Sequence, residues 1–286
     1  MCLVAAVPEV IVDLRTHPYH AVIDRVERCL GVCMDRKAAV VKRRSVGART
    51  DRNSWIRIEA RPFSKLTGQG SGVEGTACLP RVIAKPEWYQ GLSWQAPEQC
   101  VLWRADETEL VTAFPVNPGG VLRTDPELGQ VWWERLGTSL GALAAQTTTR
   151  VATPNTAPIS QERVTATIER VFADGVESTV AEWVPAHADL AWANLTAPEC
   201  WLLDWEDWGL APRGWDAATL WCSSLAVPGL AERVQREYQA DLASRSGLVS
   251  QLYFCAEMIA AGDCYAGPLA EPSRREAPRL ISALRP

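Results

Sequence analysis

The chain has 286 residues, 47% of them hydrophobic and 22% charged, which is typical of a globular protein large enough for two lobes or two small domains. Its net charge of −5 argues against a nucleic-acid-binding protein, and no apolar run approaches the roughly 20 residues that a membrane span needs. The first residues lack the basic start of a secretory signal, and the nine scattered cysteines suit free thiols better than a zinc site. We therefore expect a cytoplasmic protein without a nucleic-acid or membrane partner.

The first third of the chain predicts a small sheet with one or two helices. Helically spaced apolar residues predict a helix between a cap at Thr16 and a stop at Gly31. Alternating residues predict a strand at 54–59, while Gly47 and its polar neighbours predict a turn within 45–53. Further strand patterns lie at 38–42, 79–84, 101–103 and 110–114.

Beyond a linker at 117–120 the pattern becomes helical, so we expect one part at 1–116 and a second at 117–286. Asp125 and Ser160 are expected to cap two helices, and apolar stripes predict three more, at 230–247, 248–261 and 273–284. The first part is basic and the second acidic, which suits an anionic ligand in the first and a metal or cationic ligand in the second. Solvated surface charge alone is the simpler explanation of this asymmetry.

One segment of the second part combines residues that can perform chemistry. His187 and Asp189 precede Asn194, and Asp204 ends an apolar run. The residues around Pro198 can form a hairpin, which would bring Asn194 and Asp204 to the same end. Amide and carboxylate oxygens suit Mg²⁺, which binds substrate phosphates, and Asp189 could accept a proton from an attacking hydroxyl. Either aspartate alone is explained by a turn, so the prediction depends on the spacing.

This segment resembles the aminoglycoside phosphotransferase and choline kinase-like branch of the protein-kinase-like fold. That family has the pattern His-Gly-Asp-x-x-x-x-Asn, then Ile-Asp-Phe/Trp-Glu, then an aspartate that opens a helix. The matching elements, in the same order, are His187-Ala188-Asp189, Asn194, Leu203-Asp204-Trp205-Glu206 and Asp216-Ala217-Ala218. The resemblance implies an α+β, bilobal protein-kinase-like fold, with a small β-rich N-lobe and a larger, mainly helical C-lobe.

The resemblance also implies roles for individual residues. Asp189 would be the catalytic base and His187 would brace the catalytic loop, while Asn194 and Asp204 would hold Mg²⁺. Asp216 would be structural and would bond backbone near that loop. Taken alone, a histidine in this setting is more often a satisfied buried residue than a catalyst.

The match to the family is poorer in the N-lobe, where the Gly-rich phosphate loop is missing. Arg49, in the single-glycine segment 45–50, is the candidate phosphate contact there. Arg57 takes the place of the nucleotide-binding lysine, with Glu74 as its helix partner, and Lys42 is its rival. A solvent-facing position on an edge strand explains Arg57 equally well.

The segment joining the two parts is expected to bind the purine of ATP or GTP through its backbone, with Ala113 and Pro115 as contacts. The expected reaction moves the γ-phosphoryl group to a hydroxyl of a small molecule, such as an aminoglycoside, an amino alcohol or another antibiotic. One alternative is a Ser/Thr kinase of a precursor peptide in lanthipeptide-like biosynthesis, with a partner lyase. Another is a catalytically inactive binding partner. Trp192 and Trp208 are candidates for an apolar wall against the acceptor, although packing is the commoner role of a tryptophan.

Overall fold

The computed structural model describes residues 12–66, 68–119, 121–172 and 175–285. Its contacts divide the chain into two compact units, Met1–Ala77 with Pro86–Thr112 and Cys78–Lys85 with Ala113–Pro286. The expected division lay after residue 116, with no return of the chain. The segment Cys78–Lys85 belongs to the second unit because Ala84 donates its N–H to Ser139 Oγ (3.0 Å) and accepts from the Leu202 N–H (2.7 Å).

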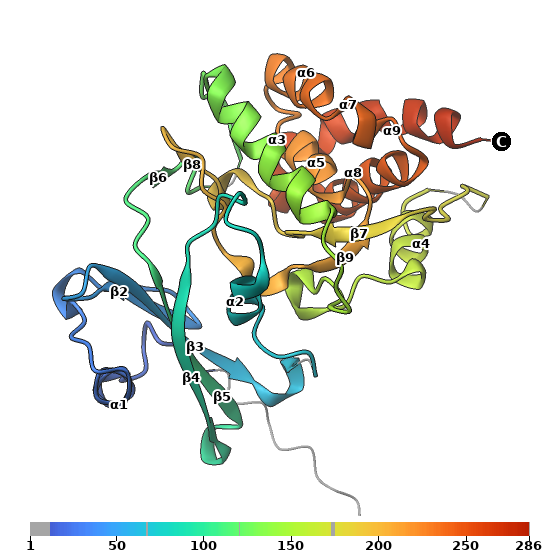
Figure 1. Cartoon of the computed structure of the whole chain (residues 1–286). Helices are drawn as coiled ribbons and strands as arrows, with labels where there is room; N and C mark the ends of the chain where they lie inside the picture. Colours follow the sequence, from blue (N-terminus) through green and yellow to red (C-terminus); the bar gives the residue numbers. More distant parts are fainter. Residues whose placement is uncertain (1–11, 67, 120, 173–174, 286) are drawn as a thin grey trace, which may run out of the picture. The chain divides into compact units, whose positions relative to one another are not determined.

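A five-stranded antiparallel sheet in the order β1-β2-β3-β5-β4 forms the centre of the first unit (Figure 1). Helix α1 (His20–Leu30) covers one face of the sheet, where Ile23 and Val26 share a core with Ile56 and Ile58. The opposite face carries Arg57, Glu59, Arg104 and Asp106 of the two central strands, as alternation along a strand requires, whereas Glu107 is buried on the α1 side beside Ile56. The strands are β1 (Val40–Val41), β2 (Ser45–Arg49), β3 (Ser54–Pro62), β4 (Trp88–Ala96) and β5 (Val101–Glu109).

The first helix and the first turn differ in part from their predictions. Helix α1 begins at His20 rather than after Thr16, whose hydroxyl donates to the Asp13 carbonyl instead (3.2 Å). Gly31 ends the helix in the left-handed region (φ 67°), as predicted. Residues 45–49 of the predicted turn form strand β2, because they pair along their backbone with β3. Glycine is needed at position 47 for packing, since a Cβ there would lie 2.6 Å from the Trp55 ring.

Other strand predictions were wrong for reasons of tertiary packing. Residues 79–84 form no strand and pack irregularly in the second unit, while the pattern at 110–114 gives only β6 (Phe114–Pro115). Strand β4 was not predicted at all. It is an edge strand of the described sheet, and its register with β5 shifts between Trp88 and Gln90, so its alternation is broken.

The second unit is mainly helical and contains two short antiparallel ribbons. Strand β6 pairs with β8 (Thr196–Ala197), and β7 (Trp183–Ala186) pairs with β9 (Gly209–Pro212). A one-turn helix, α2 (Gly72–Gly75), belongs to the first unit. The helices of the second unit are α3 (Gln130–Ala144), α4 (Gln161–Glu169), α5 (Trp215–Ser223), α6 (Pro228–Glu237), α7 (Gln239–Leu242), α8 (Arg245–Ala266) and α9 (Ala270–Leu284).

Helix ends in the second unit test the cap predictions. Ser160 caps α4, where its Oγ accepts from the Arg163 N–H (3.3 Å). Asp125 caps no helix, because its carboxylate accepts from the Glu127 N–H (2.8 Å) in a turn and α3 begins only at Gln130. The helix predicted over 230–247 breaks into α6 and α7 at Tyr238, whereas the last two predicted helices lie within α8 and α9.

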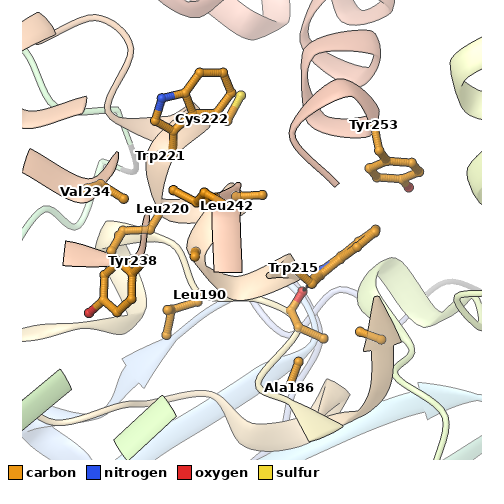
Figure 2. Packing of buried hydrophobic residues seen from close by; sticks show 14 of the residues in the cluster. Ala186, Leu190, Trp215, Leu220, Trp221, Cys222, Val234, Tyr238, Leu242 and Tyr253 are labelled. Atoms are coloured by element: carbon orange, nitrogen blue, oxygen red, sulfur yellow. Dashed lines mark hydrogen bonds between the residues drawn. The ribbon is translucent and has the colours of Figure 1, made fainter. Parts of the chain in front are cut away.

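Aromatic residues fill the core of the second unit. Trp192 is fully buried, with its ring centroid 6.1 Å from that of Trp132 and 6.2 Å from that of Trp133. Its indole N–H donates to Ser224 Oγ (3.0 Å), so Trp192 packs inside the unit and offers no wall to an acceptor. Figure 2 shows a neighbouring part of this core, with Leu220, Val234, Tyr238 and Leu242 close together and Trp215 below Tyr253.

None of the helices among the described residues has both the length and the apolar character needed to cross a membrane.

Candidate active site

The predicted hairpin exists and brings Asn194 beside Asp204. After β7 ends at Ala186, the chain runs through the loop that carries His187 and Asp189, and residues 195 and 202 then form a β-bridge. The Leu203 N–H donates to the Asn194 carbonyl at 2.8 Å. Asp204 follows directly, with a left-handed backbone (φ 67°) that begins a 3₁₀ turn, Trp205–Asp207. An aspartate tolerates this conformation better than most residues do.

Asp189 and Asn194 are joined by two hydrogen bonds. The Asn194 Nδ2 donates to the Asp189 Oδ2 at 2.9 Å and to the Asp189 carbonyl oxygen at 2.8 Å. Both bonds engage the amide nitrogen, so the amide oxygen of Asn194 is the atom that remains for a cation. The five-residue spacing in the sequence thus closes a loop with a carboxylate and an amide oxygen at one place.

Burial and like charge raise the pKa of Asp189 to about 6, from the ordinary value of 3.8. Burial is the largest cause, the negative charge of Asp204 comes next and Glu206 adds to it, while the Asn194 hydrogen bond acts in the opposite direction. Because the negative charges of Asp189 and Asp204 destabilise each other, a divalent cation bound between them would stabilise both carboxylates. The Asn194 amide oxygen and the Asp204 carboxylate together give the hard oxygen donors that Mg²⁺ prefers.

His187 links the loop to the strand that leads to Asp204. Its ring is completely buried, its Nε2 lies 2.8 Å from the Leu203 carbonyl oxygen, and its Nδ1 lies 3.4 Å from the Asp189 N–H. A carbonyl only accepts, so Nε2 carries the proton and Nδ1 is the acceptor. Burial lowers the pKa of His187 to about 4, which keeps the ring neutral. A neutral ring with both nitrogens engaged braces the loop and is unsuited to taking a substrate proton.

Asp216 anchors the same loop from the start of α5. Its two carboxylate oxygens accept the backbone N–H groups of His187 (2.7 Å) and Ala188 (2.8 Å). Burial raises the pKa of Asp216 to about 6, against the effect of these two hydrogen bonds. Ala188, which stands where the resembling family has glycine, is held in the left-handed region (φ 71°).

The first unit places its candidate residues on different parts of the sheet. Arg57 lies in the middle of β3, the central strand, and on the face opposite Ile56 and Ile58, so it is not on an edge strand. Lys42 is exposed just past the two-residue edge strand β1. Arg49 ends β2, and its guanidinium donates to Asn53 Oδ1 (2.6 Å). The segment expected as a phosphate loop therefore pairs with β3 along its backbone.

Glu74 and the segment at Ala113 have contacts that the sequence did not predict. Glu74 lies on the one-turn helix α2 and forms an ion pair with Arg104 (3.0 Å). Ala113 precedes β6, and Pro115 pairs with Thr196 within the second unit. Pro115 has no N–H, so its only polar backbone group for a purine is its carbonyl oxygen.

The sequence reading missed Arg104 and Asp106. Both lie on β5 and on the same face as Arg57, where Asp106 is its direct neighbour in register. The alternation of Trp103 and Ala105 with these two charged residues was the available signal. The predicted strand ends at residue 103, whereas β5 continues to Glu109.

No family model matches this chain, and no curated protein is similar to it in sequence. Solved structures match its fold. An aminoglycoside phosphotransferase has a TM-score of 0.57 and 10% identity, over 94% of this chain and 100% of that one. The choline kinase of Streptococcus pneumoniae has a TM-score of 0.56 and 12% identity, over 92% and 98% of the two chains. A kinase of the antibiotic amicoumacin has a TM-score of 0.53 and 10% identity, over 94% and 93%. The chain therefore has the bilobal kinase-like fold of these enzymes.

Proposed function

We propose that this protein is a Mg²⁺-dependent phosphotransferase that moves the γ-phosphoryl group of ATP or GTP to a hydroxyl of a small molecule. The observation that carries this proposal is the joint placement of Asp189, Asn194 and Asp204, with the pKa of Asp189 raised to about 6. Structures with the same fold were solved with ADP and hygromycin B, with AMP-PNP and amicoumacin, and with GDP and kanamycin.

Proton transfer in this proposal belongs to Asp189. As a carboxylate it accepts a hydrogen bond from the acceptor hydroxyl and takes its proton as the oxygen attacks the γ-phosphorus, while the bond to the nucleoside diphosphate breaks. Asn194 orients the carboxylate through Oδ2, and His187 and Asp216 hold the backbone of the loop. Catalysis depends mainly on positioning, because the loop is fixed before substrate binds.

Asn194 and Asp204 would hold Mg²⁺, which when bound neutralises phosphate charge. In the first unit, Arg57 would contact phosphate oxygens with Glu74 as a supporting anion, and Arg49 at the end of β2 would be a weaker contact. In the second unit, the backbone at Ala113 and the Pro115 carbonyl would face the purine.

The acceptor we propose is a cationic small molecule. The second unit, Cys78–Lys85 with Ala113–Pro286, carries 15 Lys and Arg against 21 Asp and Glu, so it attracts cations. The fold neighbours that bind hygromycin B, kanamycin and amicoumacin favour a small acceptor, and nothing favours the alternative peptide acceptor or a partner lyase. The retained Asp189, Asn194 and Asp204 argue against an inactive binding partner.

A transfer screen tests the proposal. The purified protein is incubated with Mg²⁺, γ-labelled ATP or GTP, and a panel of amino alcohols, aminoglycosides and short serine peptides. We expect label in a cationic small molecule with the native protein, and none with Asp189→Asn. Asp241→Asn, an equivalent change in a surface ion pair with Arg213, is the matched control and should transfer normally. Label only in peptides would contradict the small-molecule acceptor, and the absence of any Mg²⁺·nucleotide binding would contradict the phosphotransferase.

A further inference from the structure

A polar network lies on the sheet face that α1 does not cover. The Nε of Arg104 donates to both carboxylate oxygens of Asp106 (3.1 and 3.0 Å), and its Nη2 donates to Asp106 Oδ1 (2.5 Å). The same Nη2 forms the ion pair with Glu74 Oε2 at 3.0 Å. The indole N–H of Trp88 also donates to Asp106 Oδ1, at 2.8 Å. The network thus joins two strands to the one-turn helix α2.

The sheet is shaped to hold the guanidinium. Asp106 is 7% exposed, and the Arg104 side chain is 19% exposed. On the neighbouring strand, a Cβ at Gly91 would lie 2.6 Å from Arg104 Nη2 and 2.8 Å from Asp106 Oδ1. Only glycine leaves room there, so the Arg104–Asp106 ion pair of β5 packs directly against Gly91 of β4. Such fixed, partly buried pairs contribute more than mobile surface pairs do.

Glu74 depends on this network for its position. Helix α2 has four residues, too few to be stable as an isolated helix, and the Ser71 Oγ accepting from the Glu74 N–H (3.3 Å) caps it. The Glu74 side chain is half exposed, where an ion pair with a mobile partner would contribute little. Asp106 has already restricted Arg104, so the pair with Glu74 costs less side-chain entropy.

The same network adjoins Arg57. Asp106 is the register partner of Arg57, and Glu59 is the register partner of Arg104. Directly opposed residues on one sheet face have Cβ atoms roughly 5 Å apart. The Asp106 carboxylate therefore borders the space open to the Arg57 guanidinium, on the side away from Gly47.

We propose that Arg104 is a positioning residue for nucleotide binding, which holds Glu74 directly and sets the surroundings of Arg57 through Asp106. This inference rests on the proposed function. The family resemblance implied that Glu74 pairs with Arg57 of β3. Here Arg104 of β5 anchors Glu74. The Arg104 guanidinium is engaged by the carboxylates of Asp106 and Glu74, so its loss is expected to change the affinity for nucleotide more than the rate at saturation.

Calorimetric titration with Mg²⁺·ATP tests this on native protein and four variants. We expect Arg104→Gln to raise the dissociation constant about tenfold, which corresponds to the loss of one hydrogen bond to a charged group. Arg104→Lys should recover only part, because one ammonium cannot pair bidentately with Asp106 and still reach Glu74. Gly91→Ala keeps every charge but displaces the guanidinium, and should weaken binding severalfold. The matched control is Arg36→Gln, since Arg36 also pairs with two carboxylates, those of Asp24 and Glu27, beside α1.

The outcomes separate this inference from the proposed function. Native protein that binds no Mg²⁺·nucleotide contradicts the proposed function and this inference with it. Native protein that binds, with unchanged affinity in Arg104→Gln, overturns only the positioning role. Equal weakening by Arg36→Gln would show a general loss of stability and would also overturn it. Should Arg104→Gln fail to fold, Gly91→Ala decides by the same criterion, with the maximal transfer rate expected to stay within about twofold of native because the groups that bond the reacting atoms are untouched.

Discussion

The two units build their candidate sites in opposite ways. In the second unit, the candidate catalytic and metal-binding residues lie within the 30 residues from His187 to Asp216, and hydrogen bonds between side chains and the backbone of His187, Ala188 and Leu203 fix the loop. In the first unit, the charged residues come from β3, β5 and α2; the pairing of β3 with β5 and side-chain contacts such as the Glu74–Arg104 ion pair join them. The second site is therefore held by bonds among residues close in sequence. The first site depends on contacts between distant segments, so a single side-chain substitution can alter it.

The largest expected effect is a loss of phosphoryl transfer with nucleotide binding unchanged. Asp189→Asn removes the proton acceptor and keeps the shape, so transfer should fall about 10³-fold, within the range of general-base removal. Nucleotide affinity measured by titration should stay within about twofold, because Asn194 and Asp204 remain. Transfer at the native rate would mean that Asp189 is not the base.

The next effect tests whether the loop really depends on a buried anchor. Asp216→Ala leaves the N–H groups of His187 and Ala188 unpaired inside the unit, so the free energy of unfolding should fall by about 3 kcal/mol. Denaturant unfolding measures this, with Asp24→Ala on the surface of α1 as control. A loss below about 0.5 kcal/mol, typical of surface substitutions, would contradict the anchoring role.

A nucleotide titration compares the two basic candidates of the first unit. Arg57→Ala should raise the dissociation constant of Mg²⁺·ATP about tenfold to thirtyfold, because a charge-assisted donor is lost. Arg57→Lys should recover part of this loss, since lysine cannot reproduce the fork geometry. Lys42→Ala should change little, because Lys42 lies beyond the edge strand. The reverse ranking would show that Lys42 is the phosphate contact.

The pH dependence of transfer follows from Asp189. The carboxylate is the active form, so kcat/KM should fall as the pH drops through about 6, by about tenfold between pH 7 and pH 5. Initial rates at saturating acceptor and subsaturating Mg²⁺·nucleotide measure the profile of the enzyme before the metal, which would lower the pKa of Asp189, is bound. A constant rate over this range would leave no role for a base with a raised pKa.

The smallest effect concerns the residue between His187 and Asp189. Ala188 has φ 71°, a conformation that costs an L-residue roughly 1 kcal/mol more than glycine. Ala188→Gly should therefore raise the free energy of unfolding by up to about 1 kcal/mol, partly offset by the greater freedom of glycine in the unfolded chain. Thermal unfolding gives the sign, and a destabilised variant would mean that the alanine methyl contributes packing that outweighs the strain.

The sequence by itself predicted what depends on neighbours along the chain. The spacing of Asp189, Asn194 and Asp204 predicted their hairpin, and Ser160 and Gly31 marked helix ends, because the groups that they bond lie within a few residues. The kinase-like fold was implied by the resemblance of the same segment to a known family, and the fold neighbours agree with it. Whether Asp189 and the metal ligands act as proposed stays a prediction.

Only the tertiary structure decided the rest. Segments β2 and β4 are strands because they pair with β3 and β5. Gly47 resembles a turn residue in the sequence, but it is needed because the Trp55 ring lies against it. No local pattern predicts the ion pair between Glu74 and Arg104, since 30 residues separate them. The register between β3 and β5 places Arg104 on the same sheet face as Arg57, and this register is not visible in either segment alone. A helix cap or a loop bond is chosen by local geometry, whereas a cross-strand network exists only after distant segments have packed, which is why sequence reading missed it.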